Sequence, residues 1–294
     1  MSHVTAGPSA ASTVPSYAAS PNRQVRSAEE IEFAYRDLGE SATPLLLFQH
    51  FRGNLDNWDP ALVDLLAAER RVITFDNTGV GGSSGSTPHT IAEMARDALA
   101  FLDTIGVEQA DLLGFSIGSF VAQELALARP SAVRRLVLAS SAPQGAAGMH
   151  GWAPAVIEAV GGRQPNPDGY LDVFYTDSEP SREAGRASLA RIFGRADEKD
   201  EPTGWETRLA QYDAVCGWGA PDHALLQRVS AIEAPVFVAN GDSDPMIRPH
   251  YSYLLAGLIP GARVKIYPDS AHGFLFQHHS EFAADVHEFL DERD

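Results

Sequence analysis

Residues 111–123, Asp-Leu-Leu-Gly-Phe-Ser-Ile-Gly-Ser-Phe-Val-Ala-Gln, constrain the fold more than any other stretch of the chain. They indicate a short apolar strand, a tight turn around Ser116, and a helix that begins at Ile117. In so tight a turn, a side chain at Gly114 or Gly118 would collide with the neighbouring strand or helix. The strained turn places the Ser116 hydroxyl above the sheet edge, where the helix also directs free N–H groups and its positive dipole end. A flexible Gly/Ser loop is the alternative, but the strand before and the helix after favour a nucleophile elbow.

Apolar runs and helical patterns alternate on both sides of this stretch. The apolar runs predict further strands at residues 24–28, 31–35, 44–49, 71–76, 133–139, 235–240 and 263–267. Asp59-Pro60 and Thr90-x-x-Glu93 are typical helix starts, the first an N-cap followed by proline and the second a capping box. This alternation predicts an α/β fold with a mostly parallel, doubly wound sheet and helices on both faces.

The strand pattern stops for a long interval in the second half of the chain. Residues 145–230 show only helical pieces with Gly, Pro and charged joints, and they hold three of the four tryptophans, Trp152, Trp205 and Trp218. We interpret this interval as a helical cap inserted into a core formed by residues 23–144 and 231–294. For most of the tryptophans, packing of the cap onto the core is the expected role. Residues 1–22, rich in Ala, Ser and Pro, are expected to be a mobile tail and not a signal peptide.

Charge and composition exclude several classes of partner. The chain has 22 basic and 39 acidic residues, a formal net charge of −17 that repels nucleic acid and anionic lipid. No run approaches the roughly 18 apolar residues of a membrane span, so we expect neither nucleic acid nor membrane as a partner. The single cysteine, Cys216, cannot form an intramolecular disulfide and is compatible with a cytoplasmic location. We expect a small-molecule substrate, and association into a homo-oligomer stays open.

Three loops that follow strands carry the residues of a serine-based catalytic site. Serine is a weak nucleophile and needs a base that is held in place by a third group. Ser116 follows one strand, Asp242 and Asp244 follow another, and His272 follows the last. The chain order Ser, Asp, His is the α/β-hydrolase order and differs from that of the other serine-protease folds.

Two cofactor classes are not supported by the motifs. Gly79-x-Gly81 follows a strand, but the third glycine of a dinucleotide loop would fall at Ser84, where no helix begins. No cluster of His, Cys, Asp and Glu has metal-ligand spacing. We therefore expect no cofactor and no metal.

With these motifs in view, the chain resembles an α/β-hydrolase fold serine hydrolase with a helical cap, of the esterase or lactonase kind, from about Gln24 to its end. The matching motifs are His50 after an early strand, Asp76-x-x-Gly79-x-Gly81-x-Ser83, Gly114-x-Ser116-x-Gly118, Gly241-x-x-Asp244 and Ala271-His272-Gly273. The resemblance implies that Ser116 is the nucleophile, His272 the base and Asp244 the orienting acid. It also implies oxyanion N–H donors at Ile117 and at Phe51 or Arg52, with His50 supporting their loop.

Two departures from the family pattern affect these assignments. The family's His-Gly is here His50-Phe51, with the glycine displaced to Gly53, so the second oxyanion donor is Phe51 or Arg52. The family's usual arginine before Gly79 is Thr78, which removes a structural cation.

The choice between Asp242 and Asp244 follows from the loop. Asp242 directly follows the turn residue Gly241, and we expect its carboxylate to bond the turn's own N–H groups. Asp244 precedes Pro245, which restricts its backbone to extended angles and so aims its carboxylate.

The expected reaction is transfer of an acyl group to water, with an ester or lactone of a small, largely apolar compound as substrate. A serine at the elbow, where halide-releasing and epoxide-opening relatives have aspartate, argues against those reactions. A carbon–carbon bond hydrolase acting on a ketone remains an alternative, and haloperoxidase or perhydrolase activity would be a side reaction of the same acyl-serine. A ligand receptor or signalling protein that turns over little or nothing is a second alternative, because fold and triad do not prove turnover.

Overall fold

The structure is a computed structural model that describes residues 16–164 and 166–292. Its strands are β1 (Arg23–Arg26), β2 (Glu32–Leu38), β3 (Leu45–Phe48), β4 (Val72–Phe75), β5 (Ala110–Phe115), β6 (Val133–Ala139), β7 (Val236–Gly241) and β8 (Arg263–Tyr267). Its helices are α1 (Pro60–Ala67), α2 (Ile91–Thr104), α3 (Ile117–Ala128), α4 (Pro154–Val160), α5 (Pro167–Phe174), α6 (Glu179–Ile192), α7 (Trp205–Trp218), α8 (His223–Arg228), α9 (His250–Leu258), α10 (Phe274–Gln277) and α11 (His279–Asp291). Short 3₁₀ turns are η1 (Tyr17–Ala19), η2 (Leu55–Asn57), η3 (Pro130–Ala132) and η4 (Val229–Ala231).

One sheet of eight strands, in the order β1-β2-β4-β3-β5-β6-β7-β8, runs through the core. The β1–β2 and β2–β4 pairs are antiparallel, and the remaining pairs are parallel. The central strands β3, β4, β5 and β7 are buried along their whole length, as their continuous apolar runs predict. This arrangement confirms the predicted α/β fold class with a mostly parallel sheet.

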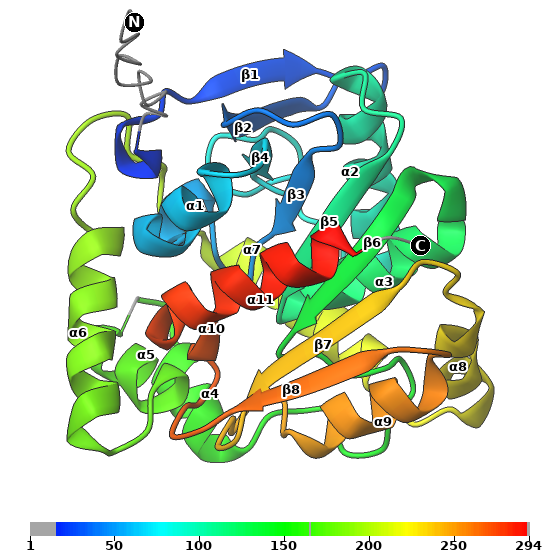
Figure 1. Cartoon of the computed structure of the whole chain (residues 1–294). Helices are drawn as coiled ribbons and strands as arrows, with labels where there is room; N and C mark the ends of the chain where they lie inside the picture. The colour runs from blue at the N-terminus through cyan, green and yellow to red at the C-terminus, as the bar shows by residue number, and fades with distance from the viewer. Residues whose placement is uncertain (1–15, 165, 293–294) are drawn as a thin grey trace, which may run out of the picture.

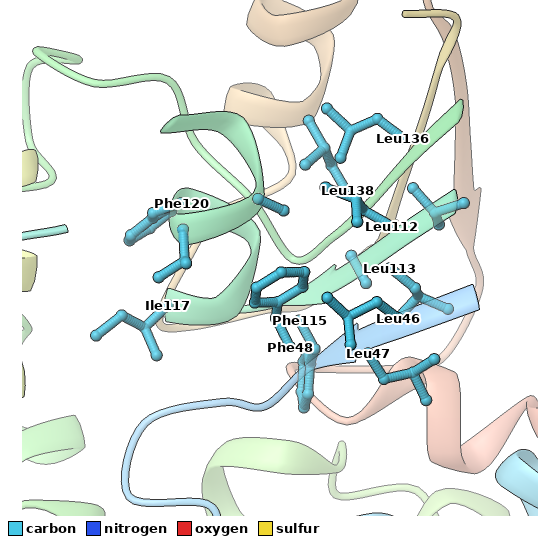
Figure 2. Close-up of a cluster of buried hydrophobic side chains, with 14 of the residues drawn as sticks. Leu46, Leu47, Phe48, Leu112, Leu113, Phe115, Ile117, Phe120, Leu136 and Leu138 are labelled. Carbon is cyan, nitrogen blue, oxygen red and sulfur yellow. The ribbon is translucent and has the colours of Figure 1, made fainter. Parts of the chain in front are cut away.

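Leucines in register join the central strands. Leu46 of β3 lies opposite Leu112 of β5, which in turn lies opposite Leu136 of β6. Figure 2 shows these side chains beside α3, together with Phe48 and Phe115 from the ends of their strands. Helices cover the sheet, with α2 packed on α3 and α1 packed on α11. The core therefore fixes the carboxyl ends of β3 and β5 relative to each other. Two candidate site loops emerge from these ends.

The interval predicted to be a helical cap lies between β6 and β7. Its described residues contain α4 to α8 and η4 and no strand. We call residues 145–230 the insertion; their boundaries remain those drawn from the sequence. In Figure 1 the arrowheads of β7 and β8 point toward α4 and α5, so helices of the insertion lie at the carboxyl ends of the strands.

The prediction that residues 1–22 form a mobile tail is wrong for residues 16–22, the part that the structure describes. Residues 1–15 lie outside the described residues, but Tyr17 is 1% exposed and belongs to the hydrophobic core. Its hydroxyl donates to Leu55 O at 2.6 Å, and its N–H donates to Asp64 Oδ1 at 2.6 Å. The guanidinium of Arg36 lies 4.8 Å from the centre of its ring. One aromatic residue in a polar stretch thus anchors the chain before β1, which a search for apolar periodicity does not detect.

Among the described residues, the structure has no helix long and apolar enough to cross a membrane.

Candidate active site

The turn between β5 and α3 has the strained geometry predicted for it. Ser116 has φ 56° and ψ −125°, a conformation that L-residues rarely adopt. Its N–H donates to Ala139 O on β6 at 3.0 Å, and its carbonyl accepts from Ser119 N–H at 2.8 Å. Bonds to the sheet on one side and to α3 on the other therefore hold the turn in this conformation.

The two glycines of the turn are sterically required. A Cβ on Gly114 would lie 2.5 Å from Gly118 O, and a Cβ on Gly118 would lie 2.3 Å from Phe48 O. The obstructing atoms belong to the backbone and cannot turn aside as a flexible side chain could. Any larger residue at either position would push α3 away from β5 or β3, which confirms the steric reason for the Gly-x-Ser-x-Gly pattern.

Asp244 and His272 form a buried pair at the carboxyl ends of β7 and β8. They are 2% and 1% exposed, and His272 Nδ1 lies 2.7 Å from Asp244 Oδ2. Asp244 Oδ1 accepts from the N–H groups of Met246 and Ile247 at 2.8 and 2.9 Å, which fixes the carboxylate. Because an ionised carboxylate only accepts, Nδ1 of His272 carries the proton and Nε2 presents a bare lone pair.

Asp242, the other acid of this loop, has a different role in the structure. It is exposed, and its carboxylate accepts from Ser243 Oγ and from the N–H groups of Asp269 and Ser270. Its N–H partners therefore belong to the turn after β8 and not, as predicted, to its own turn. The structure brings Asp244, not Asp242, to His272.

Phe115 links the elbow to both histidines of the site. Its ring centroid lies 5.1 Å from that of His272 and 5.3 Å from that of His50. Ser116, the next residue, is 3% exposed. His272 Nε2 is buried and has no hydrogen-bond partner among the described residues, so a bond from the Ser116 hydroxyl is not formed in this state. Such bonds are often long in free enzymes and tighten when substrate binds.

The loop after β3 supplies the second group of candidates. Arg52 has φ 63°, and its N–H already donates to Gln211 Oε1 at 2.7 Å. Of the two alternatives drawn from the sequence, this favours Phe51 as the oxyanion donor.

His50 braces this loop. Its Nδ1 lies 2.9 Å from Phe51 O, so Nδ1 carries a hydrogen and donates it to that carbonyl. Burial, opposed by the hydrogen bond to Phe51 O and aided by the nearby His272, lowers the pKa of His50 to about 4. His50 is therefore neutral near pH 7, and its bond to Phe51 O ties its ring to the loop; the supporting role stays a prediction.

A cavity of about 340 Å³ opens beside these loops, and His50, Phe51, Arg52 and His272 line it. The insertion supplies much of its apolar wall, with Val160, Tyr170, Phe174, Leu189, Ile192 and Phe193. Four charged residues also line it: Asp56, Arg195, Lys199 and Asp200. Phe174 contacts the catalytic candidates directly, since its ring centroid lies 5.1 Å from that of His272. Sequence reasoning did not identify Phe174 or Gln211, because the insertion has no motif that marks them.

Among the described residues, no three His, Cys, Asp or Glu side chains are grouped so as to hold a metal ion.

Comparison with known proteins adds a family to this geometry. A family model described as alpha/beta hydrolase fold matches residues 43–279. The chain is 28% identical over 254 residues to a putative carbamate hydrolase of Azorhizobium caulinodans, which covers 82% of this chain and 88% of that protein. It is 31% identical over 251 residues to a 2-hydroxymuconate semialdehyde hydrolase of Pseudomonas sp. (strain CF600), covering 81% and 82% of the two chains. A solved alpha/beta hydrolase fold protein from Chitinophaga pinensis matches with a TM-score of 0.89 and 36% identity, over 95% of this chain and 100% of that one.

Proposed function

The chain belongs to the alpha/beta hydrolase fold family, and on that premise we propose that it is a serine hydrolase that cleaves an ester or lactone through an acyl-serine intermediate. The observation that carries the proposal is the buried His272–Asp244 pair, 2.7 Å apart, at the same sheet edge as the strained turn at Ser116. In this assignment Ser116 is the nucleophile, His272 the general base and Asp244 the residue that orients it.

The reaction follows from the protonation states of the site. The bare Nε2 of His272 takes the Ser116 proton as the serine oxygen attacks the substrate carbonyl. The tetrahedral oxyanion accepts from Ile117 N–H at the start of α3 and from Phe51 N–H, and one such donor contributes about 10²–10³ in rate. The imidazolium then protonates the leaving alcohol, and the neutral imidazole activates water, which releases the acid and frees Ser116.

The cavity supports a small, largely apolar substrate. Its wall is mainly aliphatic and aromatic, and its volume of about 340 Å³ lies near the lower end of the range for small-molecule sites. An ester or lactone is favoured over an amide because an alkoxide leaving group needs less assistance than an amine. The particular acid and alcohol depend on the insertion side chains that meet the substrate.

Cleavage of a carbon–carbon bond in a ketone is the second candidate. It is favoured by the relative of 31% identity, whose name is 2-hydroxymuconate semialdehyde hydrolase. Incubation of the protein with 2-hydroxymuconate semialdehyde, with the absorbance of this compound recorded over time, separates the two candidates. An esterase would leave the compound intact while hydrolysing chromogenic esters.

A serine-directed fluorophosphonate tests the proposal. It should label Ser116 stoichiometrically and abolish turnover of p-nitrophenyl esters of several acyl lengths. The matched control is Ser243→Ala, which removes an exposed serine from the loop between Asp242 and Asp244 and should leave labelling intact. Labelling of another serine, or activity that survives full labelling, would refute the assignment. Release of a single equivalent of product without steady turnover would instead indicate the receptor alternative.

A further inference from the structure

Residues of the insertion hold both ends of the Arg52 backbone. Gln211 of α7, 1% exposed, accepts from Arg52 N–H at 2.7 Å. Thr203 Oγ donates to Arg52 O at 2.6 Å. Both partners lie about 150 positions further along the chain and within the insertion. The conformation of this loop of the core is therefore set by contacts with the insertion.

The side chain of Arg52 adds a third attachment to the same region. Its Nη1 donates to Gly162 O at 2.7 Å, and its Nη2 donates to the carbonyls of Arg163 and Thr203 at 3.4 and 3.3 Å. Arg52 forms no ion pair with an acid among the described residues. Burial lowers the pKa of its guanidinium, and the nearby cation Arg208 lowers it as well. The guanidinium therefore serves here to tie carbonyl groups of the insertion to the loop.

Aromatic contacts connect the loop to the same helix by a second route. The ring of Phe51 meets that of Trp152 edge-on at 4.8 Å, and Trp152 meets Tyr212 at 5.1 Å. Tyr212 is the neighbour of Gln211 on α7. One helix of the insertion thus reaches Phe51 through rings and Arg52 through a hydrogen bond.

We propose that Gln211 is a positioning residue, and that α7 assembles the oxyanion hole by holding the Phe51–Arg52 peptide in place. This rests on the proposed function, in which Phe51 N–H is an oxyanion donor. The peptide is fixed at both ends, because Phe51 O accepts from the His50 ring and Arg52 N–H donates to Gln211.

The strain at Arg52 explains why an external acceptor is needed. With φ at 63°, Arg52 occupies the left-handed region that a residue with a side chain adopts only when its surroundings require it. Without the Gln211 acceptor, the Arg52 N–H would be left unpaired beside the insertion, and the backbone would relax toward negative φ. That relaxation rotates the Phe51–Arg52 peptide. Because the Cα of Phe51 joins this peptide to the preceding one, which carries Phe51 N–H, the rotation also shifts Phe51 N–H away from the position of the oxyanion. The chemical step then slows, whereas binding of the ground-state ester changes little.

Two variants of Gln211 and one control test this role. Gln211→Met keeps the length of the side chain and removes the acceptor; we expect kcat for a p-nitrophenyl ester to fall about 10–100-fold, with KM within about threefold. Gln211→Glu restores an acceptor and should recover kcat to within about fivefold of wild type. The control is Thr207→Val, one turn earlier on α7, because Thr207 joins the insertion to a different loop through Gly79 O at 3.0 Å. It should keep kcat within about twofold.

The rate at which a fluorophosphonate labels Ser116 provides a readout that does not need turnover. It should fall in parallel with kcat in Gln211→Met, because the phosphoryl oxygen occupies the same oxyanion hole. Thr203→Val removes the bond to the carbonyl of Arg52. Thr203 is half-buried, so this substitution puts folding less at risk, and it should lower kcat about three- to tenfold. If Gln211→Met has the kcat and the labelling rate of the wild type, the inference is overturned and the proposed function still stands. If Gln211→Met does not fold, the same result in Thr203→Val has the same meaning. A wild-type protein that neither turns over esters nor reacts at Ser116 would refute the proposed function itself.

Discussion

Replacement of Asp244 by asparagine separates the proposed orienting acid from its neighbour Asp242 in the same loop. In the structure, Asp244 Oδ1 accepts from two backbone N–H groups and Oδ2 faces His272 Nδ1. An asparagine would keep its carbonyl oxygen on the two N–H groups and turn its NH₂ toward His272. Two donors would then face each other, so the imidazole would shift its proton to Nε2 and present Nδ1 as the acceptor.

That shift of tautomer removes the base. With a proton on Nε2, His272 has no lone pair for the Ser116 hydroxyl, and no carboxylate remains to stabilise an imidazolium. The corresponding change in the Ser-His-Asp template reduces kcat about 10⁴-fold with the geometry intact. We expect a loss of the same order in Asp244→Asn. The variant should stay folded, because the two backbone N–H groups keep an acceptor.

Asp242→Asn is the matched control. Asp242 is exposed and accepts from backbone N–H groups of the turn after β8, so one weakened bond should cost about 1 kcal/mol of stability. Steady-state hydrolysis of a p-nitrophenyl ester and thermal unfolding of both variants provide the comparison. A folded but inactive Asp242→Asn beside an active Asp244→Asn would refute the assignment of the orienting acid.

Three further predictions follow from burial and steric fit. Tyr17→Ala should lower the free energy of unfolding by about 3–5 kcal/mol, because the side chain is 1% exposed in the core; an unchanged urea midpoint would contradict the docking of residues 16–22. Burial, and after it the charge of Asp56, raises the pKa of Asp200 from 3.8 to about 6. Between about pH 4 and pH 6 the folded state therefore keeps a proton that the unfolded state has lost, so the free energy of unfolding falls as pH rises through this range. Asp200→Asn should therefore raise the free energy of unfolding at pH 7.5 by about 1 kcal/mol, a value discounted for partial exposure, and much less at pH 4; equal gains at the two pH values would argue against it. Gly118→Ala should lose about 3 kcal/mol to overpacking against the β3 backbone, whereas Gly257→Ala, with nothing within 4 Å of its added Cβ, should unfold at or above the wild-type temperature.

The fold and the candidate triad could be predicted because their signals are local. Buried parallel strands require continuous apolar runs, and the turn around Ser116 requires two glycines at fixed positions. The preference for Asp244 over Asp242 rested on Pro245, and the structure places Asp244 beside His272. Each of these requirements is met within a few residues, so the sequence displays it directly.

The residues that sequence reasoning missed depend on distant partners. Gln211 lies in a helix without a motif, and its contact with Arg52 spans 159 positions. Tyr17 lies in a polar stretch without apolar periodicity, and its pocket is built from η2, α1 and β4. The mistaken part of the tail and the undecided oxyanion donor share this cause, since neither could be settled before the chain was folded.

The order of strands along the chain has a consequence for protein synthesis. Ser116 follows β5, whereas Asp244 and His272 follow β7 and β8, beyond the whole insertion. A nascent chain that has already formed the elbow, α3 and the insertion still lacks both members of the 2.7 Å pair. The pair can form only after β8 has been translated and has docked beside β7. A ribosome thus completes the strained serine turn long before it reaches the histidine proposed to activate it. Under the proposed mechanism, every intermediate length of the chain up to that point lacks its base.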